Sequence, residues 1–172
     1  MIRATKTRYR MTILTGCGKT KATTPQPARE LYTSPLCRAR RRYAEHQLAS
    51  WESDDLLDIT GQWFILSAKF GLVDPDRELP PYEQQLRHHC PADRAAWYLH
   101  CAQLLLDGME DDEDLKHHQI QIHAGEDYAK PLLNVLWSLG FSPQWVTEGM
   151  QIGEQLAFYR RRNTEFRKLA GK

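Results

Sequence analysis

The feature that most constrains the fold is a regular alternation of short apolar segments with longer segments of helical periodicity. Apolar composition predicts four strands, at residues 9–15, 62–67, 119–124 and 145–146. Helical spacing predicts helices at residues 27–49 with a break near Thr33, at 91–106, between a capping Asp127 and Gly140, and at 151–170. Alternation of this kind is typical of α/β proteins. We therefore expect a three-layer sandwich with a mostly parallel four-stranded sheet flanked by helices.

The 172 residues are enough for one domain with a substantial core, so residues 1–172 are expected to form a single α/β domain. Residues 1–8 are predicted to be a basic arm, and the helix at 151–170 has a basic outer face. The chain has no signal peptide, and no apolar run approaches 18 residues. A cytoplasmic protein with no membrane partner is expected. The sequence does not indicate an oligomeric state.

The four cysteines form no C-x-x-C pair, which together with the expected compartment favours free thiols. Histidines and cysteines lie close together in one segment, at His88, His89, Cys90, His100 and Cys101. Their spacing matches no standard zinc pattern. We therefore expect no metal and no other cofactor.

Polar loops follow three of the four predicted strands, at residues 16–21, 67–82 and 125–128. Parallel strands end at the same edge of a sheet, and ligands of open α/β proteins bind at that edge. The three loops are therefore expected to meet there and form one site. The alternative is that they are ordinary surface connections with solvated charges.

Three common kinds of site are excluded because their motifs are missing. The segment from Gly16 to Thr20 resembles the end of a phosphate-binding P-loop, but Ile13 stands where that motif requires its first glycine. A standard ATP or GTP site is therefore excluded. The nucleophile elbow G-x-S-x-G and the dinucleotide fingerprint G-x-G-x-x-G are absent too.

The residues of the three loops combine cations, carboxylates and aromatic rings. This combination suits cleavage of a glycosidic bond to a nucleobase, in which a carboxylate stabilises a cationic sugar or orients water. Asp74 and Glu126 come soon after strand ends and are the candidate catalytic carboxylates, although either could instead be a helix cap or form a loop ion pair. The candidate substrate-binding residues are Cys17, Gly18, Lys19, Lys21, Ser67, Lys69, Tyr82 and Tyr128.

Several segments together carry a resemblance to a known group of proteins. They are T-G-C-G-K-T-K at Thr15–Lys21, P-A-R-E-L-Y at Pro27–Tyr32, I-L-S-A-K-F-G-L-V-D-P-D at Ile65–Asp76, P-P-Y at Pro80–Tyr82 and M-Q-I-G-E-Q-L at Met150–Leu156. The chain resembles a bacterial and phage family distantly related to YaaA-type proteins and to the uracil-DNA glycosylase superfamily. It is similar in size and layout to antiphage glycosylases that remove glucosylated hydroxymethylcytosine from DNA.

This resemblance implies a uracil-DNA-glycosylase-like fold and an enzyme that flips a modified pyrimidine out of phage DNA and excises it. The glycosylase motifs G-Q-D-P-Y-H and H-P-S-P are absent, so their catalytic residues cannot be transferred, and Asp74 and Glu126 stand on loop position alone. The sequence leaves two alternatives open: a YaaA-like protein that binds DNA or nucleotides without turnover, and a hydrolase of free modified nucleotides.

DNA is the expected partner, although the net charge is only +1. Basic residues are segregated along the chain, and such clusters can neutralise backbone phosphates. The candidate DNA-binding residues are Arg38, Arg41, Arg42, Arg160 and Arg161. The alternative for each cluster is a solvated helix surface. His123 lies within a predicted strand and is expected to be a core histidine rather than a catalytic one.

Overall fold

The computed structural model describes residues 8–52, 58–108, 115 and 117–171. Most of the predicted basic arm and the acidic run Glu110–Asp114 lie outside the described residues. Arg8 belongs to the first strand, because it pairs with Asp58 across the sheet.

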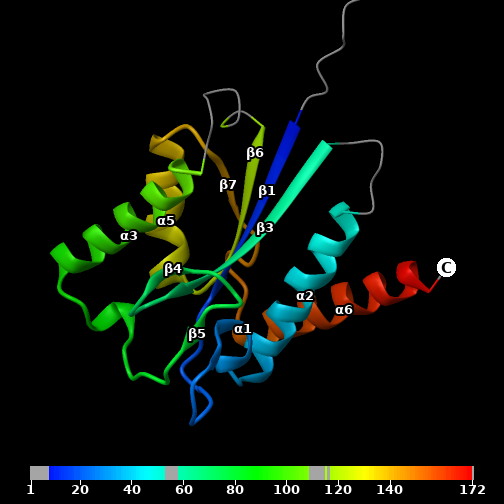
Figure 1. Cartoon of the computed structure of the whole chain (residues 1–172), viewed down its shortest axis with the longest axis horizontal. Coiled ribbons are helices and arrows are strands. Elements are labelled where there is room, and N and C mark those ends of the chain that lie inside the picture. Colours follow the sequence, from blue (N-terminus) through cyan, green and yellow to red (C-terminus); the bar gives the residue numbers. More distant parts are fainter. Residues whose placement is uncertain (1–7, 53–57, 109–114, 116, 172) are drawn as a thin grey trace, which may run out of the picture.

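The centre of the molecule is a five-stranded sheet with one antiparallel edge (Figure 1). Its strands are β1 (Arg8–Gly16), β3 (Asp58–Ser67), β4 (Gly71–Val73), β6 (His118–His123) and β7 (Ser142–Trp145). The spatial order is β4-β3-β1-β6-β7, and all neighbours are parallel except β3 and β4. The prediction of a mostly parallel α/β sheet is confirmed.

The prediction of only four strands is wrong, because the chain turns back after β3 and adds β4 at the edge. Gly71 has φ of +71°, a conformation that glycine adopts without strain, and it pairs with Ser67 at the start of the antiparallel ladder. The segment had been read as part of one long polar loop. A strand of three residues is too short to show a periodic pattern.

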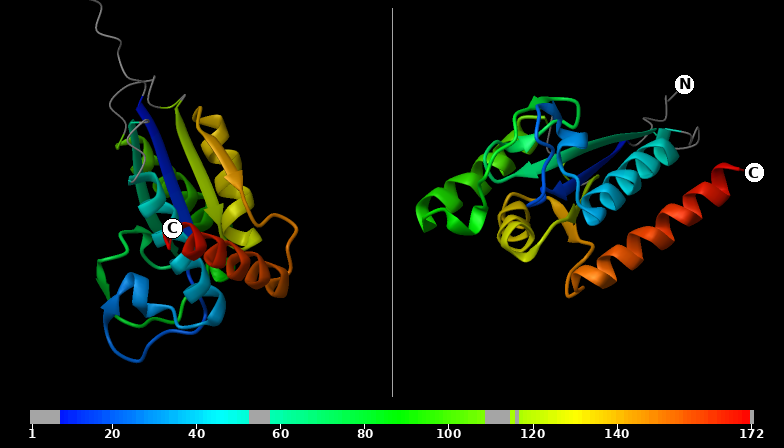
Figure 2. Two further views of the ribbon diagram at one scale, coloured as in Figure 1. Left: turned by 90° about the vertical axis from the view of Figure 1, so that its right-hand side faces the viewer. Right: turned by 90° about the horizontal axis from the view of Figure 1, so that it is seen from below.

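Helices cover both faces of the sheet, so the three-layer arrangement is confirmed (Figures 1 and 2). One face carries α2 (Pro35–Glu52) and, packed against it, α6 (Ile152–Ala170). The other face carries α3 (Pro91–Leu106) and α5 (Glu126–Ser138). The predicted break near Thr33 is real, since a short α1 (Ala28–Leu31) precedes α2. The helix predicted at 91–106 has the bounds of α3.

Alternating side chains of the central strand point into the two layers. Leu14 is fully buried in the cluster formed with α3 and α5, while Ile13 is fully buried in the cluster on the side of α1 and α2. A strand buried on both faces is expected to be apolar throughout, as the parallel strands of α/β proteins are. Residues 12–16 of β1 are accordingly buried on both sides, although Thr12 and Thr15 are polar.

A small second sheet lies beside the end of β1. It pairs β2 (Gln26–Pro27) with β5 (Glu78–Leu79) in an antiparallel arrangement. Backbone hydrogen bonds also connect α1 to the segment before β5, from Ala28 N to Arg77 O at 2.8 Å and from Arg29 N to Pro75 O at 2.9 Å. These hydrogen bonds fix the segment between β4 and β5 against α1 and β2.

His123 is a core residue, as predicted. It is fully buried at the end of β6, where its Nδ1 lies 2.9 Å from the Tyr159 hydroxyl. Burial, together with the nearby Arg40 guanidinium, lowers the pKa of His123 to about 3. The ring is therefore neutral at physiological pH and acts in packing.

Candidate functional site: a pocket at the edge of the sheet

In this strand order, the connections that follow the neighbouring strands β1 and β6 leave towards opposite faces of the sheet. The chain passes from β1 to β3 through α2 on one face, and then reaches β6, on the other side of β1, after α3 on the opposite face. β1 and β6 are therefore the two strands at a topological switch point. In open α/β sheets this is where ligands bind, beyond the carboxyl ends of the strands.

A pocket of about 200 Å³ lies at this point. It is lined by residues 17–19 after β1, residues 127–128 at the start of α5 after β6, and residues 84–87 around the 3-10 turn η1 (Leu86–His88). We call it the edge pocket. Its volume is below the roughly 300–1,000 Å³ of pockets for drug-sized ligands, so it fits one small polar ring better than a whole nucleotide.

The loop after β1 is fixed by close packing. Cys17 N donates to Leu66 O at 3.0 Å, which ties the loop to the end of β3. A Cβ on Gly18 would lie 2.6 Å from Cys37 Sγ, so only glycine allows the loop to pack against the first turn of α2. Burial raises the pKa of the Cys37 thiol, and this thiol is therefore a packing group.

Tyr128 forms one wall of the edge pocket. Its hydroxyl lies 3.3 Å from Cys17 Sγ, and its ring meets Trp97 edge to face at 5.6 Å between centroids. Burial, followed by the neighbouring Cys17 thiol, raises the pKa of Tyr128. Tyr128 therefore presents a neutral hydroxyl to the pocket over the whole physiological pH range.

The remaining lining brings charges and amides of different kinds together. Lys19 and Arg87 contribute cations, and Asp127 contributes a carboxylate. Gln84 and Gln85 contribute side-chain amides, and Gln84 Nε2 donates to His89 Nε2 at 2.7 Å. Amides, a carboxylate and cations around one small space can bind a heterocycle by its polar edge and an attached phosphate by its charge.

Neither predicted catalytic carboxylate lines the edge pocket. Asp74 is exposed in the turn after β4, where its Oδ1 accepts from Asp76 N at 2.8 Å. The Glu126 side chain is 70% exposed and lies 3.5 Å from Lys130 Nζ. Asp127, which the sequence predicted as a helix cap, is the carboxylate that faces the pocket; Gly125 occupies the cap position of α5.

Ser67, Tyr82 and Lys21 do not line the edge pocket, and lie together with Tyr32 in a separate cluster. The Tyr82 hydroxyl lies 2.8 Å from Ser67 Oγ and 2.9 Å from the Tyr32 hydroxyl, and all three side chains are buried. Lys21 Nζ covers the Tyr82 ring at 4.3 Å from its centroid. We call Tyr32, Ser67 and Tyr82 the tyrosine network. Because Tyr82 is only 6% exposed, it does not combine with Tyr128 to enclose a base.

Burial is the largest cause that raises the pKa of both tyrosines of the network. The pKa of Tyr32 rises to about 12, and that of Tyr82 is raised further. Ser67 Oγ also accepts from the backbone N–H groups of Lys69 and Phe70, at 3.3 and 3.1 Å. The network therefore fixes the turn between β3 and β4.

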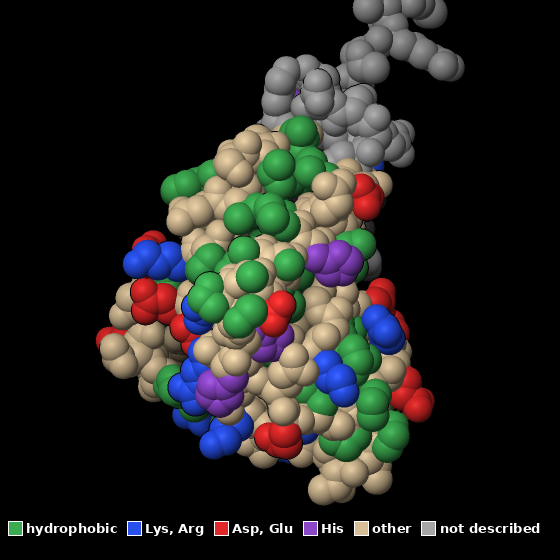
Figure 3. All heavy atoms as spheres, turned by 90° about the vertical axis from the view of Figure 1, so that its left-hand side faces the viewer, with side chains coloured by type: hydrophobic (Ala, Val, Ile, Leu, Met, Phe, Trp, Pro, Cys, Tyr) green, Lys and Arg blue, Asp and Glu red, His purple; other side chains and the backbone are tan. Residues whose placement is uncertain are grey.

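Lys69 opens into a different hollow, which shares Gln84 and Gln85 with the edge pocket. This hollow is wide, about 700 Å³, and His88, His89 and His100 line it. In the face that carries α3 and α5, basic and histidine side chains lie mostly in the lower half, near the carboxyl edge, while apolar side chains cover much of the upper half (Figure 3). Across the described residues, no group of three or more His, Cys, Asp or Glu is arranged to hold a metal ion.

The predicted DNA-binding arginines fall into two groups. Arg38, Arg42 and Arg160 line the seam between α2 and α6. Arg41 is committed to ion pairs, since its guanidinium lies 2.5 Å from Glu30 Oε2 and 3.6 Å from Glu45 Oε1. Arg161 is exposed and does not line that seam.

The segment 84–87 is the part of the site that sequence reasoning missed. It follows Pro80–Tyr82, where the predicted functional loop was taken to end. The polar run of Gln84 and Gln85 between that loop and the helix starting at Pro91 was the available signal. Four of the eight predicted substrate-binding residues line the edge pocket: Cys17, Gly18, Lys19 and Tyr128.

The fold and the pocket together define an open α/β protein with a pocket at the switch point of its sheet. Its family follows from comparison with known sequences: the model of DUF6884, a family of unknown function, matches residues 12–161. The chain belongs to this family. Comparison with curated proteins and with solved structures gave no match. Among the described residues, no helix has the length and apolar character needed to cross a membrane.

Proposed function

We propose that this protein is a DNA N-glycosylase whose edge pocket receives a modified pyrimidine flipped out of the duplex. The observation that carries the proposal is the lining of this pocket: one carboxylate, two cations, two amides and a neutral tyrosine surround a space about the size of one ring. The resemblance to the uracil-DNA glycosylase superfamily and to antiphage glycosylases supports the same assignment. Phage DNA carrying glucosylated hydroxymethylcytosine is the proposed substrate.

Recognition of the base would come from the amides and the tyrosine. Gln side chains can donate to and accept from the polar edge of a base, and the fixed hydrogen bond from Gln84 to His89 orients one of them. Tyr128 would contact the flipped ring. Lys19 and Arg87 would bind the phosphates that flank the flipped nucleotide, which offsets the cost of unstacking it.

Asp127 is the group proposed to act at the sugar. As the bond between the base and C1′ lengthens, positive charge develops on the sugar ring, and a carboxylate beside it lowers the energy of this state. Water then adds to C1′ and loses a proton, while the base leaves with the bonding electrons and takes up a proton. The products are the free base and an abasic site. No residue is assigned as a Schiff-base nucleophile, so no strand cleavage by the protein itself is expected.

The test uses duplex oligonucleotides of one sequence that carry cytosine, hydroxymethylcytosine or glucosylated hydroxymethylcytosine at one position. Each is incubated with the protein and then treated with alkali, which breaks the strand at an abasic site. We expect cleavage of a modified duplex only. Release of the free base, measured by mass spectrometry, identifies the bond that was broken.

Two other results would replace the proposal. Salt-sensitive binding of all three duplexes without any abasic product would indicate a DNA-binding protein without turnover. Base release from free modified nucleotides, and from none of the duplexes, would indicate a nucleotide hydrolase.

A further inference from the structure

A groove of about 470 Å³ runs along the seam between α2 and α6, and arginines from both helices line it. Arg38 and Arg42 are one helical turn apart on α2, and Arg160 and Arg167 are two turns apart on α6. Residues at these spacings share one face of a helix, so both pairs face the seam. We call this the arginine groove, defined by Arg38, Arg42, Arg160 and Arg167.

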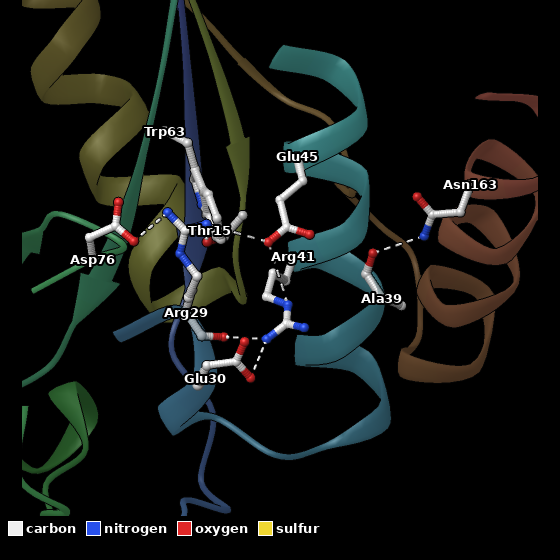
Figure 4. Close-up of polar contacts among 9 residues, drawn as sticks. All are labelled: Thr15, Arg29, Glu30, Ala39, Arg41, Glu45, Trp63, Asp76 and Asn163. Atoms are coloured by element: carbon white, nitrogen blue, oxygen red, sulfur yellow. Dashed lines mark hydrogen bonds and ion pairs between the residues drawn. The ribbon is translucent and has the colours of Figure 1, made fainter. Parts of the chain in front are cut away.

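The positive charge of the groove is not neutralised by the protein. None of its four arginines forms an ion pair within the described residues, and no carboxylate is part of its lining. Nearby arginines behave differently: Figure 4 shows Arg29 against Asp76 and Arg41 against Glu30. Arg167 is held along its own helix, with Nε donating to Asn163 O at 3.3 Å. Four guanidinium groups brought together without carboxylates favour a bound polyanion.

The floor of the groove is polar although it lies between two packed helices. Asn163 is only 7% exposed; its Nδ2 donates to Ala39 O at 3.0 Å across the seam (Figure 4), while its buried Oδ1 has no partner. An ordered water in the groove could donate to this acceptor and accept from a guanidinium beside it, whereas a phosphate oxygen, which is itself an acceptor, could not.

A further buried arginine lies behind the groove. Arg40 is 6% exposed and donates to Gln155 Oε1 at 2.6 Å, and like the groove arginines it forms no ion pair in the described part of the chain. Arg40 is not part of the lining of the groove but lines a small separate cavity with Thr15 and Trp63 of the sheet. Its charge is costly to bury unless an anion approaches it.

We propose that the arginine groove binds the phosphate backbone of DNA. Its walls carry charge on both sides of a concave seam, which fits a narrow chain of phosphates and would leave a flat lipid surface in contact with the rim only. The guanidinium fork binds phosphate oxygens through two parallel hydrogen bonds. This assignment goes beyond the proposed function, because backbone binding at this seam requires no base release and would persist in a protein without turnover.

The groove and the edge pocket are joined by one short stretch of chain. Gly18, in the pocket loop, packs against Cys37, and Cys37 precedes Arg38 in the first turn of α2. Pocket and groove otherwise belong to different layers, since Asp127 and Tyr128 are on α5 at the opposite face of the sheet. A DNA strand in the groove would thus contact the protein away from the base it presents.

The experiment compares two double variants that remove the same charge. Arg38→Gln with Arg160→Gln removes two of the four charges of the groove, whereas Arg77→Gln with Lys168→Gln removes two exposed cations outside it. Binding of an unmodified fluorescent duplex is measured by anisotropy between about 50 and 200 mM salt, a range over which phosphate contacts weaken strongly. Thermal unfolding of both variants confirms that they are folded.

We expect the slope of log K against log salt to become shallower by about 1.8 for the groove variant, since each lost phosphate contact contributes about 0.9. The control variant should retain the slope of the natural protein. An equal change in both variants would overturn the proposal, because overall charge alone would then explain binding. Binding of phosphatidylserine vesicles that depends on the groove, with no binding of the duplex, would overturn it in favour of a membrane surface.

The failure of this proposal can be told from the failure of the proposed function. An unmodified duplex yields no product, so its affinity reports on the groove alone. If the groove variant binds the unmodified duplex as the natural protein does, while base release is intact, the groove proposal is rejected. If binding depends on the groove but no duplex releases a base, the glycosylase proposal is rejected.

Discussion

The edge pocket and the tyrosine network lie beyond the ends of neighbouring strands and contain similar residues. They differ in whether their polar groups are already hydrogen-bonded inside the protein. In the network, the hydroxyls of Tyr32, Ser67 and Tyr82 bond to one another and to backbone, and the side chains are buried. In the pocket, Lys19, Arg87 and Asp127 face an open space. The difference teaches that residue type and loop position do not define a site. What matters is whether the hydrogen-bonding capacity is already used inside the protein.

The largest expected effect separates the pocket carboxylate from its neighbour in the chain. Asp127→Asn should lower the rate of base release by about 10²–10⁴-fold, the usual contribution of a positioned acid or base. Glu126→Gln is the matched control, because it removes the same charge from the same first turn of α5 and lies outside the pocket. Single-turnover base release measures both. An equal loss in the control would contradict the assignment, because the loss of a charge from this turn would then explain the effect at either position.

The second prediction concerns alkaline pH and the tyrosine network. The folded pKa of Tyr32 is about 12, against about 10 in an unfolded chain, so above pH 10 the unfolded state loses a proton that the folded state keeps. Stability should therefore be fully present below pH 10 and fall by about 3 kcal/mol for Tyr32 as the pH rises to 12. The free energy of unfolding of Tyr32→Phe, measured with denaturant at several pH values, should fall over this pH range by about 3 kcal/mol less than that of the natural protein.

A third prediction distinguishes support from substrate contact. Tyr82→Phe removes the hydroxyl that joins Ser67 to Tyr32, and it should lower the free energy of unfolding by about 1–2 kcal/mol. Base release per folded molecule should stay within about twofold of the natural protein, since a residue outside the pocket has no contact to lose there. A large rise in KM with unchanged stability would instead place Tyr82 in the site.

The smallest effect is expected for two lysines that stand two residues apart. Lys21→Met removes a cation over the Tyr82 ring and should cost about 0.5–1 kcal/mol of stability, the range for exposed cation–π pairs. Lys19→Met should leave stability nearly unchanged and weaken binding of a modified duplex. Unfolding and anisotropy measurements on both variants test this division. A loss of stability in Lys19→Met, with weaker duplex binding in Lys21→Met, would contradict it.

The fold could be predicted from the sequence largely because its parallel strands are buried on both faces. Segments such as Trp63–Leu66 are apolar throughout, and the helices between them keep a clear apolar stripe, so the element order follows from composition and periodicity. β4 and the β2–β5 pair could not be predicted, because strands of two or three residues carry no pattern. They depend on the turn at Gly71 and on tertiary contacts.

A pocket does lie at the predicted edge of the sheet, but only part of its lining was predicted, and its role as a site stays a prediction. Strand order was unknown, and it is the adjacency of β1 and β6 that joins Cys17 to Tyr128 and leaves the end of β3 to the network. The sequence predicts Asp127 as a cap because Asp is favoured there, whereas Gly125 takes that position and Asp127 lies in the first turn of α5, in the lining of the pocket. A difference of two residues in the position of the helix cap therefore separates the prediction for Asp127 from its observed place in the lining of the pocket.

The contact between Cys17 and Tyr128 spans 111 positions along the chain and so also bears on folding. Closing a loop of this length costs entropy that local contacts do not return, and proteins rich in distant contacts fold slowly. The first wall of the pocket is synthesised early, and its opposite wall arrives only with α5. A chain interrupted before residue 128 would lack the pocket, so binding competence should appear late in folding, after the central strands have paired.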